Sequence, residues 1–189
     1  MNWFVRISLA RKHIKRLSWL MSNPVYLEDL TAEWIVELGA GAAIFDHDGV
    51  LGPNKSHGPD EEGRRLLRDA VERLGQGKVF VLSNTKSRKV VRQAHYKDNH
   101  PDVAYLAARS KPDPEGLHMA SAASCVPVEK VAVVDDGLLT GILMALEAGA
   151  LPVYALRRSM AEPWEPWIIR MATTAPQKIT VRALGLISG

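Results

Sequence analysis

The sequence has a single cysteine, Cys125, among its 189 residues, and only 6% of its residues are aromatic. One cysteine cannot form an internal disulfide, so we expect no disulfide framework and a reducing compartment. No apolar run approaches the roughly 18 residues that a membrane-spanning helix needs. The sequence also lacks internal repeats and low-complexity linkers. We therefore expect a cytoplasmic protein, with peripheral membrane contact left open.

Acidic residues are missing from the first 27 positions, which carry five basic ones: Arg6, Arg11, Lys12, Lys15 and Arg16. The chain as a whole has 24 Lys and Arg against 21 Asp and Glu, so the residues after position 27 carry 19 basic against 21 acidic side chains. The basic pI of about 9.1 therefore reflects one segment. No nucleic-acid-binding surface is indicated, because a basic domain or stripe is not present beyond that segment.

Short apolar segments alternate with helical patterns through the middle of the chain. The predicted strands are Ala42–Phe45, Lys78–Leu82, Val103–Leu106, Val131–Val134 and Pro152–Leu156. The predicted helices are Glu61–Leu74, Ser87–Lys97, Pro114–Ser124 and Leu138–Ala148. This alternation is typical of crossover units, and it predicts a three-layer α/β fold with a mostly parallel sheet.

The two ends of the chain differ from this core. Residues 1–25 are predicted to form a basic, amphipathic helix ahead of a catalytic domain over residues 26–189. An apolar stripe runs along it through Trp3, Ile7, Ala10, Ile14, Leu17 and Met21. The helix could anchor at a membrane surface, pack on the core, or act as a targeting segment. A second apolar, aromatic cluster includes Trp164, Pro166, Trp167, Ile168 and Ile169.

Polar side chains stand where the predicted strands end or in the loops nearby. They are Asp46, Asp48, Ser83, Asn84, Lys111, Asp135 and Asp136. In an open parallel sheet the carboxyl ends of the strands share one edge, where ligands bind. Four carboxylates gathered there repel one another unless a cation lies between them. Mg²⁺ fits this need, because it takes oxygen ligands from one or two carboxylates together with a phosphate.

These residue types support phosphoryl transfer. An aspartate can act as a nucleophile and form an aspartyl-phosphate. A second acid two residues further on can protonate the leaving oxygen and later deprotonate water. A hydroxyl and a lysine nearby can bind the phosphoryl oxygens and neutralise their charge. Asp46 with Asp48, and Ser83 with Lys111, match these requirements.

The same residues carry a family resemblance. The segment Asp46-His47-Asp48-Gly49-Val50-Leu51 resembles the first motif of the haloacid dehalogenase (HAD) superfamily. Ser83 resembles the second motif, Lys111-Pro112 the third and Asp135-Asp136 the fourth. All four occur in the family's order, over roughly residues 42–156. The resemblance implies a HAD-like fold and a magnesium-dependent phosphatase, since family dehalogenases lack the acid found here at Asp48.

The resemblance also implies a role for each residue. Asp46 would be the nucleophile and a metal ligand. Asp48 would be the general acid and base, with its backbone carbonyl as a second metal ligand. Asp136 would be the third metal ligand, and Asp135 either competes for that place or lies outside it. His47, between the two acids, is interpreted as a spacer.

The other motif residues would hold the phosphate. Ser83 resembles the phosphoryl-binding hydroxyl, with Asn84 beside it, and Lys111 resembles the charge-neutralising lysine. Arg157 and Arg158 follow the last predicted strand. They could meet an anionic headgroup or lie on the solvated surface.

The intervals between the motifs are short. Neither Gly52–Gly77 nor Asn84–Ser110 has room for the cap domain that many HAD enzymes carry, so we expect an open site suited to a large substrate. The chain further resembles a capless branch that includes phosphatidylglycerophosphate phosphatases. That branch usually has Gly-Asp at positions 135–136, Asp where this chain has Gly141, and Asn-Thr where it has Gly49-Val50.

Three functions are compatible with these residues. The first is hydrolysis of a large or membrane-bound phosphomonoester such as phosphatidylglycerophosphate. The second is a protein or nucleotide phosphatase that uses the same side chains. The third is a catalytically impaired protein of the HAD fold that binds phosphorylated partners.

Overall fold

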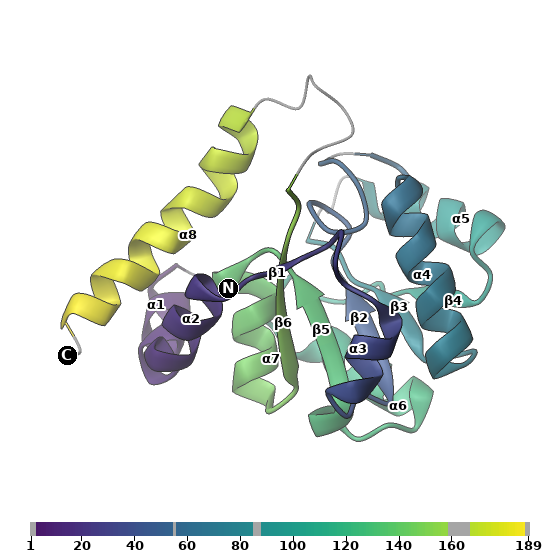
Figure 1. The fold of residues 1–189 in the computed structure, drawn as a ribbon, viewed down its shortest axis with the longest axis horizontal. Helices are drawn as coiled ribbons and strands as arrows, with labels where there is room; N and C mark the ends of the chain where they lie inside the picture. The colour runs from purple at the N-terminus through teal and green to yellow at the C-terminus, as the bar shows by residue number, and fades with distance from the viewer. Residues whose placement is uncertain (1–2, 55, 85–87, 159–166, 188–189) are drawn as a thin grey trace.

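A parallel sheet of six strands forms the centre of the molecule (Figure 1). The structure, a computed structural model, describes residues 3–54, 56–84, 88–158 and 167–187. The strands are β1 (Val25–Tyr26), β2 (Ala42–Phe45), β3 (Val79–Val81), β4 (Val103–Tyr105), β5 (Val131–Asp135) and β6 (Leu151–Leu156). They lie in the order β1-β6-β5-β2-β3-β4, and every neighbouring pair is parallel. The predicted α/β fold class is confirmed, and the short strand β1 adds an edge that was not predicted.

Helices cover both faces of this sheet. On one face lie α3 (Ala32–Glu37), α4 (Glu61–Leu74) and α5 (Lys89–Asn99), and on the other α6 (Glu115–Ser124) and α7 (Leu143–Ala148). Two short helical turns, η2 (Val128–Lys130) and η3 (Leu138–Ile142), flank β5. Side chains of β2 alternate between the two faces, as the pleat requires. Ala43 and Phe45 pack towards α4, and Ala42 and Ile44 pack towards α6 and α7.

Helix α4 shows why the sequence forms these elements where it does. The side chain of Asp60 accepts a hydrogen bond from the backbone N–H of Gly63 at 2.9 Å, which caps the first turn. Gly75, at a φ of 98°, lets the chain leave the helix after Leu74. Both ends therefore agree with the predicted bounds Glu61–Leu74. The buried face carries leucines and alanine at helical spacing.

No cap domain is evident in the described residues. Between β2 and β3 lie one loop and α4, and between β3 and β4 lie α5 and its flanking loops. All of these elements belong to the sheet layers described above. The carboxyl edge of the sheet is therefore not covered by a separate domain over residues 3–54, 56–84 and 88–158.

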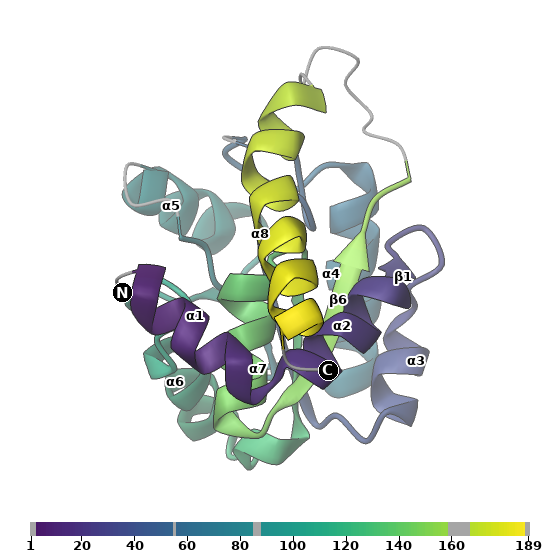
Figure 2. The ribbon, with the colours of Figure 1, turned by 90° about the vertical axis from the view of Figure 1, so that its left-hand side faces the viewer.

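Helices from the two terminal segments pack together beside β6 (Figure 2). The segment predicted as one helix over residues 1–25 is two helices, α1 (Trp3–Lys12) and α2 (Ile14–Ser22), which meet at His13. They pack with α7, η3 and a long helix, α8 (Trp167–Ile187). Of the second predicted cluster, Trp164 and Pro166 lie outside the described residues.

Most of the apolar stripe of the N-terminal segment faces the protein, whereas Trp3 at its start is 43% exposed. Ile14 and Leu17 are buried against Leu143 of α7 and Val181 of α8, in a core shared with Tyr154 of β6. This packing corresponds to the interpretation in which the stripe joins the core. Among the described residues, none of the helices combines the length and the apolar character that crossing a bilayer requires.

Candidate active site

The parallel register brings the ends of three strands to one edge. Phe45 of β2 is paired with Val81 of β3 on one side and with Val134 of β5 on the other. The residues that follow these three therefore leave the sheet side by side. This places Asp46 next to Asp135 on one side, and next to the loop that begins at Leu82 on the other.

Lys111 lies between two of the predicted carboxylates. Its Nζ is 2.7 Å from Oδ1 of Asp46 and 2.5 Å from Oδ2 of Asp135. Only 2% of Lys111 is exposed. Burial opposes the charge on Lys111, but the carboxylates of Asp135 and Asp46 outweigh it and raise the pKa of the lysine above its usual value. Lys111 is therefore a cation fixed at the centre of the site.

Asp46 occupies a crowded acidic environment. Burial raises the pKa of Asp46 well above the usual range, Lys111 opposes that effect, and the charges of Asp135 and Asp136 add to it. The cause is physical crowding, because the charged form of each carboxylate disfavours that of its neighbours. A divalent cation among these oxygens would relieve this repulsion.

The donor set fits such an ion. Carboxylate oxygens of Asp46, Asp135 and Asp136 all lie within 4.8 Å of one another. They are hard oxygen ligands, the type that Mg²⁺ prefers. Gly49 makes room for this arrangement, since a Cβ at that position would overlap the Asp136 carboxylate, and its φ of +86° also favours glycine. Asp46 and Asp136 would therefore hold the metal, and Asp135, which also pairs with Lys111, lies close enough to compete for that place.

Asp48 is held by a residue that the sequence did not single out. Arg92 of α5 donates from Nη1 to Oδ2 of Asp48 at 2.7 Å and from Nη2 to Oδ1 at 2.6 Å. The same Nη1 donates to Oγ of Ser83 at 2.8 Å, and Ser83 donates to Oδ2 of Asp48 at 3.0 Å. Arg92 also donates from Nε to the backbone carbonyl of Ser56 at 2.9 Å. The predicted acid/base and the predicted phosphoryl-binding hydroxyl thus share one buried guanidinium.

The sequence gives little indication that Arg92 belongs to the site. An arginine within a polar helix is usually solvated. In the structure Val90 is 80% exposed, whereas Arg92 and Tyr96 are the buried residues of α5. Their spacing of four residues is the one pattern that pointed to this face.

Asn84 contacts the lysine loop. Its Oδ1 accepts from the backbone N–H of Lys111 at 2.7 Å, and its Nδ2 donates to the carbonyl of the same residue at 3.3 Å. Both polar groups of the side chain are therefore used to hold Lys111 in place. In this arrangement Asn84 positions the lysine loop, and its predicted contact with phosphate stays a prediction.

His47 points away from the carboxylates into the core. Ser56 Oγ donates to the carbonyl of Gly58 at 2.9 Å, so His47 Nε2 donates to Ser56 Oγ at 2.9 Å and His47 Nδ1 accepts from the hydroxyl of Tyr96 at 2.8 Å. Burial, with the nearby charge of Arg92, lowers the pKa of His47 to about 4. A neutral histidine in this position ties the motif loop to α5.

Asp135 fills space that the glycine at position 141 leaves free. A Cβ on Gly141 would overlap the carboxylate of Asp135. Oδ1 of Asp135 also accepts from the backbone N–H of Gly137 at 2.7 Å. An acid at position 135 and a side chain at position 141 are therefore mutually exclusive in this arrangement.

The comparisons with known proteins agree with this geometry. The model of the haloacid dehalogenase-like hydrolase family matches residues 8–149. The chain belongs to the haloacid dehalogenase-like hydrolases. Family members typically use Mg²⁺, and an acidic cluster that could hold a metal ion is present in this hydrolase. No curated protein matches the chain.

One solved structure resembles this HAD-like hydrolase. It is the crystal structure of an uncharacterised protein from Corynebacterium glutamicum ATCC 13032, with 23% sequence identity and a TM-score of 0.48. The similarity covers 72% of this chain and 96% of that protein.

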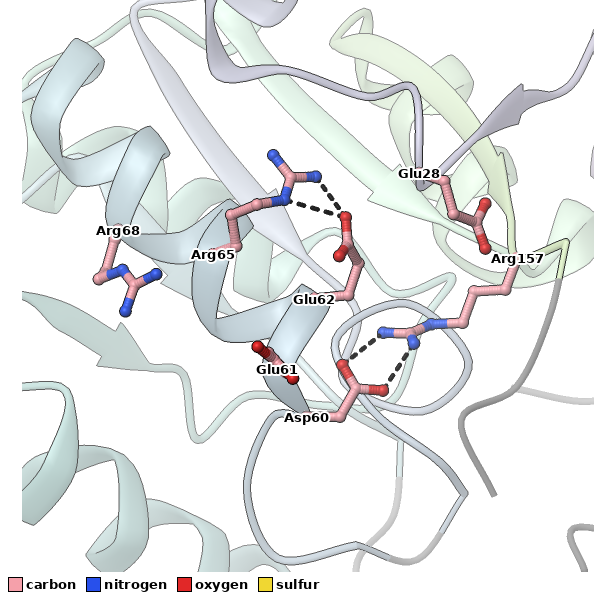
Figure 3. A pocket seen from close by; sticks show the side chains of 7 residues that line it. All are labelled: Glu28, Asp60, Glu61, Glu62, Arg65, Arg68 and Arg157. Carbon is pink, nitrogen blue, oxygen red and sulfur yellow. Dashed lines mark hydrogen bonds and ion pairs between the residues drawn. The ribbon is translucent and has the colours of Figure 1, made fainter. Parts of the chain in front are cut away.

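A cavity of about 350 Å³, lined by charged side chains, lies between the first turns of α4, Glu28 after β1 and Arg157 after β6 (Figure 3). Its lining contains none of the predicted catalytic residues. Arg157, only 5% exposed, donates to both carboxylate oxygens of Asp60 and to the carbonyl of Val50. It therefore ties β6 to the motif loop and to the first turn of α4. Arg158 is exposed, pairs with Asp29 and stacks over the ring of Tyr26.

Proposed function

We propose that this chain is a magnesium-dependent phosphomonoester hydrolase that works through an aspartyl-phosphate on Asp46. The observation that carries the proposal is the convergence of Asp46, Lys111 and Asp136 at the carboxyl edge of the sheet. Asp48 and Ser83 stand hydrogen-bonded to each other in the loops of the same edge. This set of nucleophile, acid/base, cation and hydroxyl suits transfer of a phosphoryl group to water.

The proposed reaction has two halves. A carboxylate oxygen of Asp46 attacks phosphorus, the bond from phosphorus to the leaving oxygen breaks, and Asp48 gives that oxygen a proton. Asp48 then takes a proton from water, whose oxygen attacks phosphorus and releases Asp46 with inorganic phosphate. Lys111 and Ser83 hold the phosphoryl oxygens in both halves. A bound Mg²⁺ supplies positive charge that draws the anionic substrate to an anionic nucleophile.

Arg92 supports both halves by orientation. Its two contacts to Asp48 fix the plane of that carboxylate, and its contact to Ser83 fixes the hydroxyl relative to it. Such bidentate pairs restrict geometry more than a single hydrogen bond does. Arg92 is therefore a positioning residue for the acid/base.

The substrate that we propose is large or membrane-bound, with phosphatidylglycerophosphate first. The described residues include no cap domain, so a bulky substrate could reach Asp46 and shield the reaction with its own body. The resemblance to the capless branch of phosphatidylglycerophosphate phosphatases supports the same substrate. The exchange of acid and glycine between positions 135 and 141 keeps one carboxylate in that part of the site.

The test is magnesium-dependent phosphate release from a panel of substrates, comparing wild type with Asp46→Asn. The panel contains phosphatidylglycerophosphate in vesicles, a phosphopeptide, nucleotides and an aryl phosphate. Asp102→Asn is the matched control, because it makes the same change at an exposed loop position. We expect turnover in wild type and the control, a preference for the vesicles, and none in Asp46→Asn. Preference for a soluble substrate would overturn the lipid proposal, and no turnover of any substrate would make the protein a phosphate binder.

A further inference from the structure

Helices α1, α2 and α8 form one layer on the β6 side of the molecule (Figure 2), here called the terminal helical layer. Their sequences contain eight basic residues and no acidic one. The rest of the chain carries 16 basic and 21 acidic residues. Two segments from opposite ends of the chain therefore combine into one strongly cationic layer on an otherwise acidic protein.

This layer also exposes large apolar side chains. Among the described residues, twelve large hydrophobic side chains are exposed, and half of them lie in these three helices. Phe4 is 76% exposed, Ile179 65% and Leu186 86%. Ile179, the exposed Arg182 and Leu186 share one face of α8, because they are three and four residues apart. Val181 and Leu184 of the same helix point into the core instead.

The layer touches the loops of the candidate active site. Nη2 of Arg6 in α1 lies 3.4 Å from the backbone carbonyl of Lys111. On α8, Oε1 of Gln177 accepts from the backbone N–H of Leu139 at 2.8 Å, in the turn that follows Asp136. A surface that binds to this layer would therefore lie beside the phosphate chemistry.

We propose that the terminal helical layer docks the protein on an anionic lipid bilayer and so presents the active site to a phospholipid substrate. Basic residues are attracted to anionic headgroups, while exposed aromatic and aliphatic side chains enter the boundary between headgroups and acyl chains. The substrate part of this inference rests on the proposed function, and the docking part does not.

Charge and side-chain type select this partner over two others. A second copy of the chain would bring eight like-charged basic residues against eight more, which is unfavourable. A single-stranded nucleic acid would use the positive charge and stack on aromatic rings, but it offers no binding partner for the aliphatic Ile179 and Leu186. A bilayer satisfies both the charge and the exposed aliphatic side chains.

The test is co-sedimentation of the full chain with vesicles of phosphatidylcholine alone or mixed with phosphatidylglycerol. Two variants change exposed residues of the layer, namely Ile179→Ser/Leu186→Ser and Arg11→Glu/Lys15→Glu/Arg182→Glu. Their matched controls make the same changes elsewhere on the surface, namely Val36→Ser/Met119→Ser and Arg68→Glu/Lys97→Glu/Lys130→Glu. We expect wild type and both controls to bind the anionic vesicles only.

Both layer variants should bind those vesicles at least tenfold more weakly. Each basic residue near an anionic surface contributes roughly fivefold, and the Ile179→Ser/Leu186→Ser variant loses the aliphatic side chains that would enter the boundary between headgroups and acyl chains. Hydrolysis of a soluble aryl phosphate is measured on the same proteins and should be unchanged. Docking is overturned if wild type does not sediment with anionic vesicles, or if layer and control variants bind equally. It is also overturned if the layer variants instead lose self-association or oligonucleotide binding. If the protein hydrolyses aryl phosphate but does not bind vesicles, docking is overturned and the proposed function stands. If it binds vesicles but hydrolyses nothing, the proposed function is overturned and docking stands.

Discussion

Arg92 donates hydrogen bonds from Nη1 and Nη2 to the two carboxylate oxygens of Asp48, at 2.7 Å and 2.6 Å. The arginine side chain itself is not exposed to solvent. A buried charge of this kind is tolerated only with an excellent partner geometry, which the bidentate pair provides. The third contact, to Ser83, makes the arginine a common support for two residues of the proposed reaction. The proposed acid/base is therefore held from a helix on which the sequence motifs do not lie.

Replacing Arg92 should impair the chemical step more than substrate binding. For Arg92→Lys we expect kcat to fall at least about tenfold, or roughly 1.4 kcal/mol, with little change in KM, because a lysine keeps the charge but loses the fork geometry. In Arg92→Leu, which also loses the charge, kcat should fall further. Steady-state kinetics on an aryl phosphate check this, with the exposed Arg68→Leu as control. Equal loss in the control, or a change confined to KM, would contradict a positioning role.

Asp136 and Asp135 should differ in what they do. Both belong to the acidic cluster, but Asp135 is 1% exposed and paired with Lys111, whereas Asp136 is partly exposed. For Asp136→Asn we expect the Mg²⁺ concentration for half-maximal turnover to rise at least about tenfold. For Asp135→Asn we expect a lower free energy of unfolding, since Lys111 loses a buried partner. Magnesium titration and denaturant unfolding of both variants decide between them. If Asp135→Asn rather than Asp136→Asn raises the Mg²⁺ concentration for half-maximal turnover, the metal ligand is Asp135.

The acid at position 135 and the glycine at position 141 should behave as a pair. Gly141→Asp puts a side chain where the Asp135 carboxylate lies, so we expect a loss of about 2 kcal/mol or more in the free energy of unfolding. The exchange variant Asp135→Gly/Gly141→Asp should recover much of that loss, and also magnesium-dependent turnover. A double variant whose loss equals the sum of the single ones would show that the two positions are independent.

His47 should make the protein less stable in mild acid. Its folded-state pKa of about 4 lies below the ordinary value of 6.5, so the unfolded chain binds a proton first as the pH falls. This contribution is complete above pH 6.5 and is lost as the pH falls towards 4, by about 3 kcal/mol for a group this buried. The free energy of unfolding, measured with denaturant across that range, should fall more steeply with decreasing pH for wild type than for His47→Gln. Identical slopes would mean that His47 does not stay neutral in the fold.

The sheet and the motif residues could be predicted because they follow local rules. Ala42–Phe45 is an uninterrupted apolar segment that ends in an aspartate, and Glu61–Leu74 carries its own cap at Asp60. The parallel register then dictates that Asp46 and Asp135 meet. The strand and the helix each follow from local sequence, and the meeting of the two aspartates follows once the sheet is expected to be parallel.

The parts that were missed depend on contacts between distant segments. Arg92 is buried only because Asp48, 44 positions earlier, lies opposite it. Helix α8 continues through Pro176, a residue that predicts a break, and it packs on α2 from the other end of the chain. The division of the N-terminal segment at His13 likewise accompanies a contact with Glu147 of α7. A single sequence holds no local pattern for such partners.

The central claim is that Asp46 carries the phosphoryl group during turnover. The most direct measurement is mass spectrometry of the Asp46 peptide after acid quenching during turnover of an aryl phosphate with Mg²⁺, for wild type, Asp48→Asn and Asp46→Asn. We predict a phosphorylated Asp46 in wild type, a larger phosphorylated fraction in Asp48→Asn, in which hydrolysis of the intermediate is slowed, and none in Asp46→Asn. Turnover that survives Asp46→Asn, or phosphate found on another residue instead, would contradict the account.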